Sequence, residues 1–149
     1  MSKQKRNAGV TGVYHVLPTP TALSQAYKLS EGSLRNFFRL KRIGVKLRYF
    51  PDPPPDAPYF DMDIDKITGA GQPPIYELRI DEVIAGNDNL RFIFFPVKTV
   101  LENDRLPRLW VLAVLQKKTQ KFSNNQLKTF KMQRQLILTR HYEATNVST

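Results

Sequence analysis

Three strand-like segments follow one another in the second half of the chain, and they leave few folds open. They cover residues 75–83, 90–97 and 109–115, and each is rich in β-branched and aromatic residues. Gly86-Asn87-Asp88 predicts a turn between the first two. A shorter segment at residues 11–17 predicts one more strand. Successive strands without an intervening helix favour antiparallel pairing, so we predict an α+β fold, with a mostly antiparallel sheet of about four strands and helices on one face.

Apolar residues recur at helical spacing before and after these strands. Residues 21–43 carry two apolar stripes with a break at Ser30-Glu31-Gly32, which predicts two helices. Ser30 can cap the second of them and Gly44 can end it. Ser123 can cap a last helix that runs from residue 124 to about residue 142. The sequence therefore predicts two N-terminal helices and one C-terminal helix.

The length and composition indicate a single domain over residues 1–149. The hydrophobic fraction is 41% and the aromatic fraction 11%, which is enough for a folded core. We interpret residues 1–9 as a basic tail. Residues 48–74 hold seven prolines and five aspartates, which predicts a long acidic loop with one short turn of structure near residues 64–67.

Charge is segregated along the chain. Eleven of the thirteen acidic residues lie between Asp52 and Asp104. From Arg105 to Tyr142 there is no acid but there are nine lysines and arginines, so we expect a positive field there. The net charge of +10 points to nucleic acid, an acidic protein or a membrane surface as the partner.

Several classes of site are excluded by composition. Without cysteine the chain has no disulfide, thiolate nucleophile or cysteine-based zinc site, and two histidines are too few for a histidine-based metal site. No apolar run is long enough to span a bilayer, and no signal-peptide stretch follows the basic start. We therefore expect a cytoplasmic protein that uses no metal and no cofactor and does not act at a membrane.

Basic residues on neighbouring strands predict an anion site. In a simple meander, Arg79 and Arg91 lie on adjacent strands, near the Lys117-Lys118 pair that ends the third. Either arginine alone is better interpreted as a solvated strand residue, but two beside a lysine pair favour phosphate binding. The step from these lysines into a capped helix also suits phosphate, because helix N-terminal amides point outward.

The last helix adds further candidates. Leu127 and Phe130 belong to its predicted core face, and Arg134 and His141 fall on that same face, with Tyr142 at its border. Arg134 either reaches past the sheet edge into water or needs a counter-ion, which an acid of the middle segment or a ligand phosphate could supply. His141 and Tyr142 are the candidates for proton transfer.

An ordered set of motifs carries a family resemblance. It comprises Ile75-Tyr76-Glu77-Leu78-Arg79-Ile80, Leu90-Arg91-Phe92-Ile93-Phe94-Phe95, the strand that leads into Lys117-Lys118-Thr119-Gln120-Lys121, and the helix with Arg134. Together they resemble the RelE/HigB toxin superfamily, in particular its phage-derived host-inhibition branch. The resemblance covers residues 75–137 well and residues 34–44 weakly.

This resemblance implies a RelE-like domain that acts as the toxin of a type II toxin–antitoxin system. Such a toxin is a metal-independent endoribonuclease that cuts mRNA on the ribosome, and its antitoxin commonly has a helix-turn-helix domain. The ribose 2′-hydroxyl attacks, while basic residues orient the scissile phosphate and stabilise its charge. By motif position these are Arg79, Arg91, Lys117, Lys118 and Arg134. The basic positions Lys121, Lys128 and Lys131 are further candidates for phosphate contacts.

The chain departs from the family at several positions. Ser123 stands where proline often follows the lysine run, Phe130 replaces a small residue, and Ile137 lies near a frequent tyrosine. Two other functions therefore compete with the nuclease. One is a non-catalytic module that binds RNA or phosphate, and the other is an interaction protein of a mobile element whose basic helix binds an acidic partner.

Overall fold

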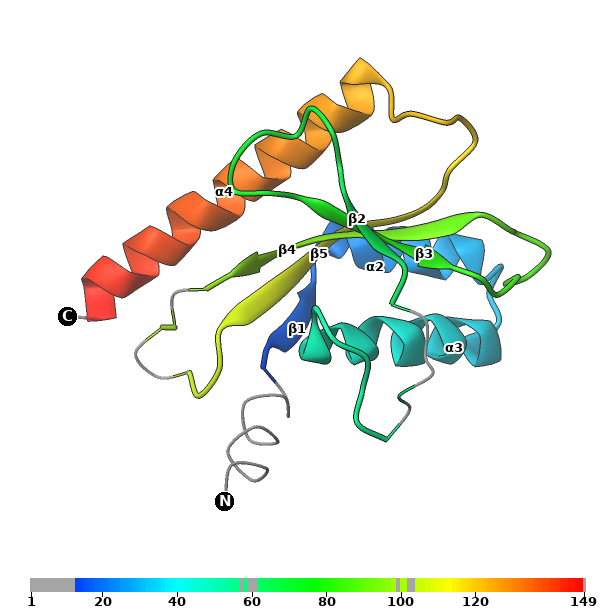
Figure 1. Cartoon of the computed structure of the whole chain (residues 1–149), viewed down its shortest axis with the longest axis horizontal. Coiled ribbons are helices and arrows are strands. Elements are labelled where there is room, and N and C mark those ends of the chain that lie inside the picture. The colour runs from blue at the N-terminus through cyan, green and yellow to red at the C-terminus, as the bar shows by residue number, and fades with distance from the viewer. Residues whose placement is uncertain (1–12, 57, 59–61, 99, 102–103, 149) are drawn as a thin grey trace.

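The computed structural model describes residues 13–56, 58, 62–98, 100–101 and 104–148, with side chains up to residue 140. It contains one five-stranded sheet in the order β1-β5-β4-β3-β2 (Figure 1). The elements in chain order are β1 (His15–Pro18), α2 (Pro20–Leu29), α3 (Leu34–Val45), the 3₁₀ helix η1 (Lys46–Tyr49), β2 (Ile64–Lys66), β3 (Tyr76–Ile80), β4 (Leu90–Val97), β5 (Arg108–Gln116) and α4 (Asn124–Ser148).

The mostly antiparallel α+β architecture is confirmed, with one strand more than predicted. β2–β3, β3–β4 and β4–β5 pair antiparallel, while β1 pairs parallel to β5 at the edge. The additional strand is β2, where Ile64 lies opposite Leu78 and Lys66 opposite Tyr76. It lies within the predicted acidic loop at residues 48–74. Proline and aspartate dominate that loop, so its short alternating segment gave little strand signal.

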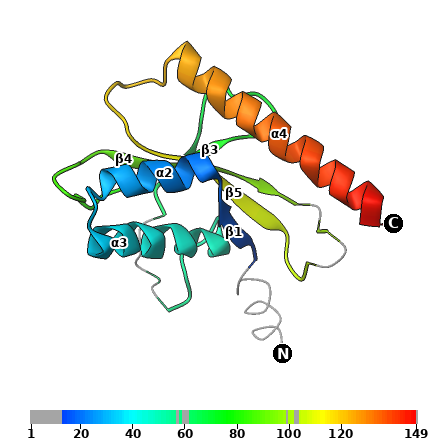
Figure 2. The same cartoon turned by 180° about the vertical axis from the view of Figure 1, so that it is seen from behind.

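Helices cover both faces of the sheet, so the expectation of one covered face is wrong. α2 and α3 lie against one face and α4 against the other (Figures 1 and 2). The central strand β4 explains this, because it is buried on both sides. Phe92 and Phe94 belong to the core cluster under α2 and α3, whereas Ile93 and Phe95 belong to the cluster under α4. An apolar run without alternation is typical of a strand covered on two faces.

The two N-terminal helices and the break between them are confirmed, but the predicted capping residue and the predicted stop of the second helix are wrong. The side chain of Ser33, not Ser30, accepts a hydrogen bond from the Asn36 amide and caps α3. Ser30 ends α2 and donates to the Ala26 carbonyl at 2.7 Å. Gly44 lies inside α3 and does not end it. A Cβ atom at that position would lie 2.5 Å from Cε2 of Phe92, so the glycine allows the helix to pack closely on the sheet.

The C-terminal helix begins where the sequence predicts and continues further. Ser123 accepts from the Gln126 amide at 3.1 Å, and the Gln126 side chain accepts from the Ser123 amide at 2.9 Å, which is a capping box. Phe130 is buried against the sheet, and Leu127 and Ile137 pack around it, as the helical spacing indicated. In the part of the chain that the structure describes, no helix combines the length and apolarity that a membrane span needs.

Candidate functional site

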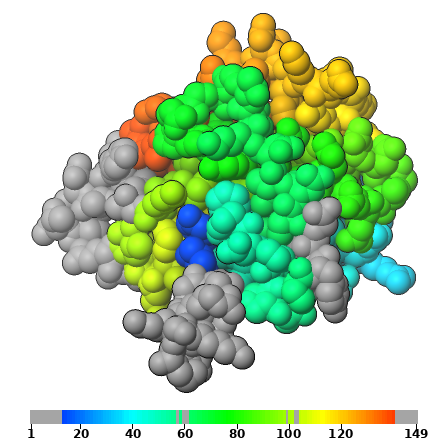
Figure 3. Space-filling model, viewed as in Figure 1, coloured from blue at the N-terminus to red at the C-terminus, as the bar shows by residue number. Residues whose placement is uncertain are grey.

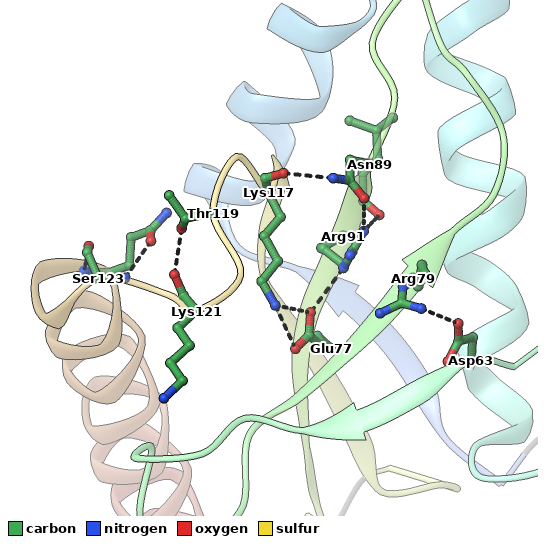
Figure 4. Close-up of polar contacts among 11 residues, drawn as sticks. Asp63, Glu77, Arg79, Asn89, Arg91, Lys117, Thr119, Lys121 and Ser123 are labelled. Atoms are coloured by element: carbon green, nitrogen blue, oxygen red, sulfur yellow. Dashed lines mark hydrogen bonds and ion pairs between the residues drawn. The ribbon is translucent and has the colours of Figure 1, made fainter.

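A single carboxylate joins two of the predicted cationic residues on the α4 face of the sheet. Glu77 of β3 accepts from Nε of Arg91 at 3.0 Å, and both of its oxygens lie 3.4 Å from Nζ of Lys117 (Figure 4). The side chains of Glu77 and Lys117 are each 13% exposed and that of Arg91 is 5% exposed. We call these three residues the sheet-face cluster.

Arg91 is held rigidly within this cluster. Its Nη1 donates to Oδ1 of Asn89 and to the Leu90 carbonyl, each at 3.2 Å. Asn89 also joins the strand ends, because it donates to the Lys117 carbonyl at 3.1 Å and accepts from the Lys117 amide at 2.9 Å. The start of β4 and the end of β5 are thereby fixed to each other, which positions both cations.

Lys117 is oriented by an aromatic ring as well as by Glu77. Its Nζ lies 4.5 Å from the centroid of the Phe122 ring, a cation–π geometry. Phe122 in turn packs edge-on against Phe130 of α4, with ring centroids 5.4 Å apart. Packing of Phe122 on Phe130 of α4 therefore helps to fix the position of the ammonium group.

Arg79 lies on the same face but is paired differently. It is opposite Arg91 in the β3–β4 register, and cross-strand partners of a sheet point to the same side. Its Nη1 lies 3.2 Å from Oδ2 of Asp63, and half of the side chain is exposed. An acid of the middle segment thus partly neutralises this arginine.

Arg134 makes its described contacts with a loop and not with the sheet-face cluster. The residue is 8% exposed, and its Nη1 donates to the Ala70 carbonyl at 2.8 Å and to the Pro73 carbonyl. Burial lowers the pKa of Arg134 from its usual value. The sequence suggested an acid, a phosphate or water as its partner. The described partners of Nη1 are backbone carbonyls, because the loop before β3 folds onto α4.

The remaining lysine candidates are exposed. In the described part of the chain, no hydrogen bond or ion pair joins their side chains to the sheet-face cluster, and Lys121 does not point to Glu77 in Figure 4. The capping box of Ser123 also occupies the Gln126 amide, one of the donors that a phosphate at this helix end would use. The residues concerned are Lys118, Lys121, Lys128 and Lys131.

His141 and Tyr142 cannot be placed relative to this site. Their backbone belongs to α4, but their side chains lie outside the described part of the chain. The structure therefore leaves the prediction that they transfer protons as it stood.

Glu77 is absent from the site residues predicted from the sequence. The segment after Arg105 lacks acids of its own, yet Glu77 pairs with Lys117, and Asp104 pairs with Arg108 at 2.9 Å. A signal was present in the alternation of β3, which places Glu77 on the same face as Arg79. Among the described side chains, no group of three or more histidine, aspartate or glutamate residues could hold a metal ion.

Comparisons of the chain with protein-family models, with curated proteins and with solved structures found no match. The likeness to RelE/HigB toxins is therefore a resemblance of motifs.

Proposed function

We propose that the chain is a metal-independent endoribonuclease of the RelE/HigB kind, the toxin of a toxin–antitoxin pair, and that the sheet-face cluster binds the scissile phosphate. The observation that carries this proposal is the convergence of Arg91 and Lys117 on Glu77. Two cations and one carboxylate leave one net positive charge on a preorganised surface. Fixed cations of this kind stabilise the charge that develops on phosphate in the transition state.

The cluster retains donors for a ligand. A guanidinium has five N–H donors and an ammonium has three, more than Glu77 can accept. Arg91 uses Nε and Nη1 in its described contacts, and Lys117 shares its ammonium between the Glu77 oxygens and the Phe122 ring. Both cations can therefore bind a phosphate while they hold the carboxylate in place.

Glu77 is the candidate general base. RNA cleavage without a metal needs an acceptor for the 2′-hydroxyl proton, and a fixed carboxylate beside the phosphate cations can take it. The 2′-oxygen then bonds to phosphorus as the bond to the 5′-oxygen breaks, and the leaving oxygen takes a proton from an acid. His141 and Tyr142 remain the proposed acids.

Ribosome-bound mRNA as the substrate and a helix-turn-helix antitoxin as the partner rest on the motif resemblance. A small helix-turn-helix gene beside this one would support the pairing, and rescue from growth arrest by its product would establish it. Expression that is harmless without such a partner would argue against a toxin.

A non-catalytic RNA-binding module is the second candidate, and the pairing of both cations with Glu77 favours it. Glu77→Gln separates the two functions, because it removes the proposed base together with a negative charge. For the nuclease we expect cleavage of ribosome-bound mRNA to fall about 100-fold or more while RNA affinity stays equal or rises. Primer extension in a reconstituted translation reaction measures the first, and fluorescence anisotropy the second.

The outcomes are distinct. If the unmodified chain cuts no mRNA on the ribosome but binds RNA, and Glu77→Gln tightens that binding, the module replaces the nuclease. Cleavage at the full rate by Glu77→Gln would show that Glu77 is not the base. If the chain has no salt-sensitive RNA affinity, the remaining alternative applies, which is an interaction protein whose basic helix binds an acidic partner.

A further inference from the structure

A second basic region lies on the other side of the sheet from the proposed cleavage site. Between Glu31 and Asp52 the sequence has no acid and six cations, and α3 and η1 account for most of this segment. Both elements pack on the face opposite α4 (Figures 1 and 2). The six cations are Arg35, Arg39, Lys41, Arg42, Lys46 and Arg48.

These cations line a groove of about 890 Å³ along α3 and η1, which we call the α3 groove. Arg35, Arg39 and Arg42 follow one another at a spacing of four and three residues, so they share one side of the helix. Among the described residues, the lining also includes Pro54, and its acids are Asp56 and Glu82. Six cations against two acids leave a surplus of four positive charges. The residues after α3, in turquoise and blue-green, reach the surface beside β1 (Figure 3).

Several of the groove cations are available to a ligand. Arg35, Lys41 and Arg42 are exposed and take part in none of the ion pairs that the described residues form. Arg39 pairs with Glu82 at 2.9 Å, and these side chains are 31% and 50% exposed. A pair this open to solvent contributes little to stability, so a phosphate can replace the carboxylate.

An exposed aromatic ring lies among these charges. Phe38 lines the same groove and is 51% exposed, while its ring contacts Phe37 at a centroid distance of 6.0 Å. Cations that follow a backbone, beside an aromatic ring on which a base can stack, are typical of surfaces that bind single-stranded nucleic acid. Of the other apolar residues of α3, Leu40 and Ile43 are buried against the sheet, whereas Leu34 and Val45 are exposed.

We propose that the α3 groove binds the phosphate backbone of single-stranded RNA, as a second contact surface separate from the sheet-face cluster. Glu82 of the groove and Glu77 of the cluster are five residues apart, so their Cα atoms are at most about 18 Å from each other. One RNA strand that passes round the edge of the sheet reaches both surfaces. That consequence rests on the proposed cleavage function, whereas binding in the groove does not.

The test measures binding to a single-stranded RNA of about 20 nucleotides with 2′-O-methyl groups, which blocks attack by the 2′-oxygen and keeps the phosphates. Arg35→Glu with Arg42→Glu reverses two exposed groove charges. The matched control is Lys28→Glu with Lys98→Glu, which makes the same change in net charge at exposed positions outside the groove. Equal melting temperatures of all three proteins establish that the fold is kept. If the melting temperature of the groove variant falls, Arg35→Gln with Arg42→Gln replaces it, and Lys28→Gln with Lys98→Gln becomes the matched control.

We expect the groove variant to bind about tenfold more weakly or worse, with a slope of log affinity against log salt that is smaller by about 1.4, from two lost contacts at about 0.7 each. The control should lose less than about threefold. Equal losses in both variants would reflect net charge alone and would overturn the proposal, as would unchanged affinity of the groove variant.

Phe38→Ala tests whether the α3 groove binds single-stranded RNA through base stacking. The substitution should weaken the affinity for single-stranded RNA by about fivefold or more and leave the affinity for duplex RNA unchanged, because the bases of a duplex already stack on one another. Equal losses for both RNAs would refute base stacking on Phe38. Since the methylated RNA cannot be cut, these results are independent of the cleavage assay. A chain that cuts no RNA would contradict the proposed nuclease function and leave the groove proposal intact. Groove variants that bind RNA as the parent does, with intact cleavage, would contradict the groove proposal alone.

Discussion

The sheet-face cluster and the α3 groove are both basic, but they differ in burial and in whether their cations are paired with an acid. In the cluster, the buried Arg91 and the largely buried Lys117 share one carboxylate, and hydrogen bonds and an aromatic ring fix their positions. In the groove, Arg35 and Arg42 are exposed and lack an acid partner among the described residues. Buried cations need partners because desolvation is costly, whereas exposed cations are solvated by water. The cluster therefore has the fixed geometry that chemistry requires, and the groove has the free charge that gives affinity.

The largest expected effect comes from removal of the carboxylate that pairs the two cations of the sheet-face cluster. Glu77→Ala leaves Arg91 and Lys117 buried without their carboxylate, so we expect the free energy of unfolding to fall by roughly 3 kcal/mol. Glu82→Ala, the matched change at the groove, removes a solvent-exposed pair and should cost about 0 to 1 kcal/mol. Urea denaturation followed by the fluorescence of the single tryptophan, Trp110, measures both. Similar losses in the two variants would contradict the contrast between buried and exposed charge.

A smaller effect concerns the other buried cation of the α4 face. Arg134→Met removes the donor to the Ala70 and Pro73 carbonyls, and we expect a loss of about 2 kcal/mol, since hydrogen bonds to charged groups are worth about 1.5 to 3 kcal/mol. Lys131→Met, at an exposed position of the same helix, should change stability by less than about 0.5 kcal/mol. Thermal unfolding provides the comparison. If Arg134→Met is as stable as the parent but loses RNA affinity, Arg134 serves the ligand and not the loop.

The smallest expected effect belongs to the core under the α3 groove. Burial, and then the neighbouring Tyr76, raise the pKa of Tyr14 above its usual value of 10.0. A group whose pKa is raised by folding contributes stability that is fully present below the pKa of the unfolded chain and is lost as pH rises through the folded pKa. The parent protein should therefore lose more stability between pH 9 and pH 11 than Tyr14→Phe, which has no hydroxyl to ionise. Parallel urea titrations that show equal losses would contradict this assignment.

Much of the local structure follows from the sequence because it depends on neighbouring residues. The alternation of β3, the apolar stripe of α4 and the capping box of Ser123 each arise within a few residues of chain. The same alternation already places Arg79 and Glu77 on one face. Gly44 shows the limit of such reasoning, because its role depends on Phe92, which is distant in the chain.

The sequence by itself determined the type of each main element, the mostly antiparallel sheet and the excess of positive charge. Tertiary structure alone decided which charges are free. Glu77 pairs with a lysine 40 residues away. Asp63, just before β2, pairs with Arg79 of the neighbouring β3, and Arg134 donates to carbonyls more than 60 residues earlier. The physical reason is that charge is compensated through space, by whichever donor or acceptor the fold brings within a few ångströms. The charge pattern along the chain therefore located the basic segments, but the three-dimensional packing separated the paired cluster from the open groove.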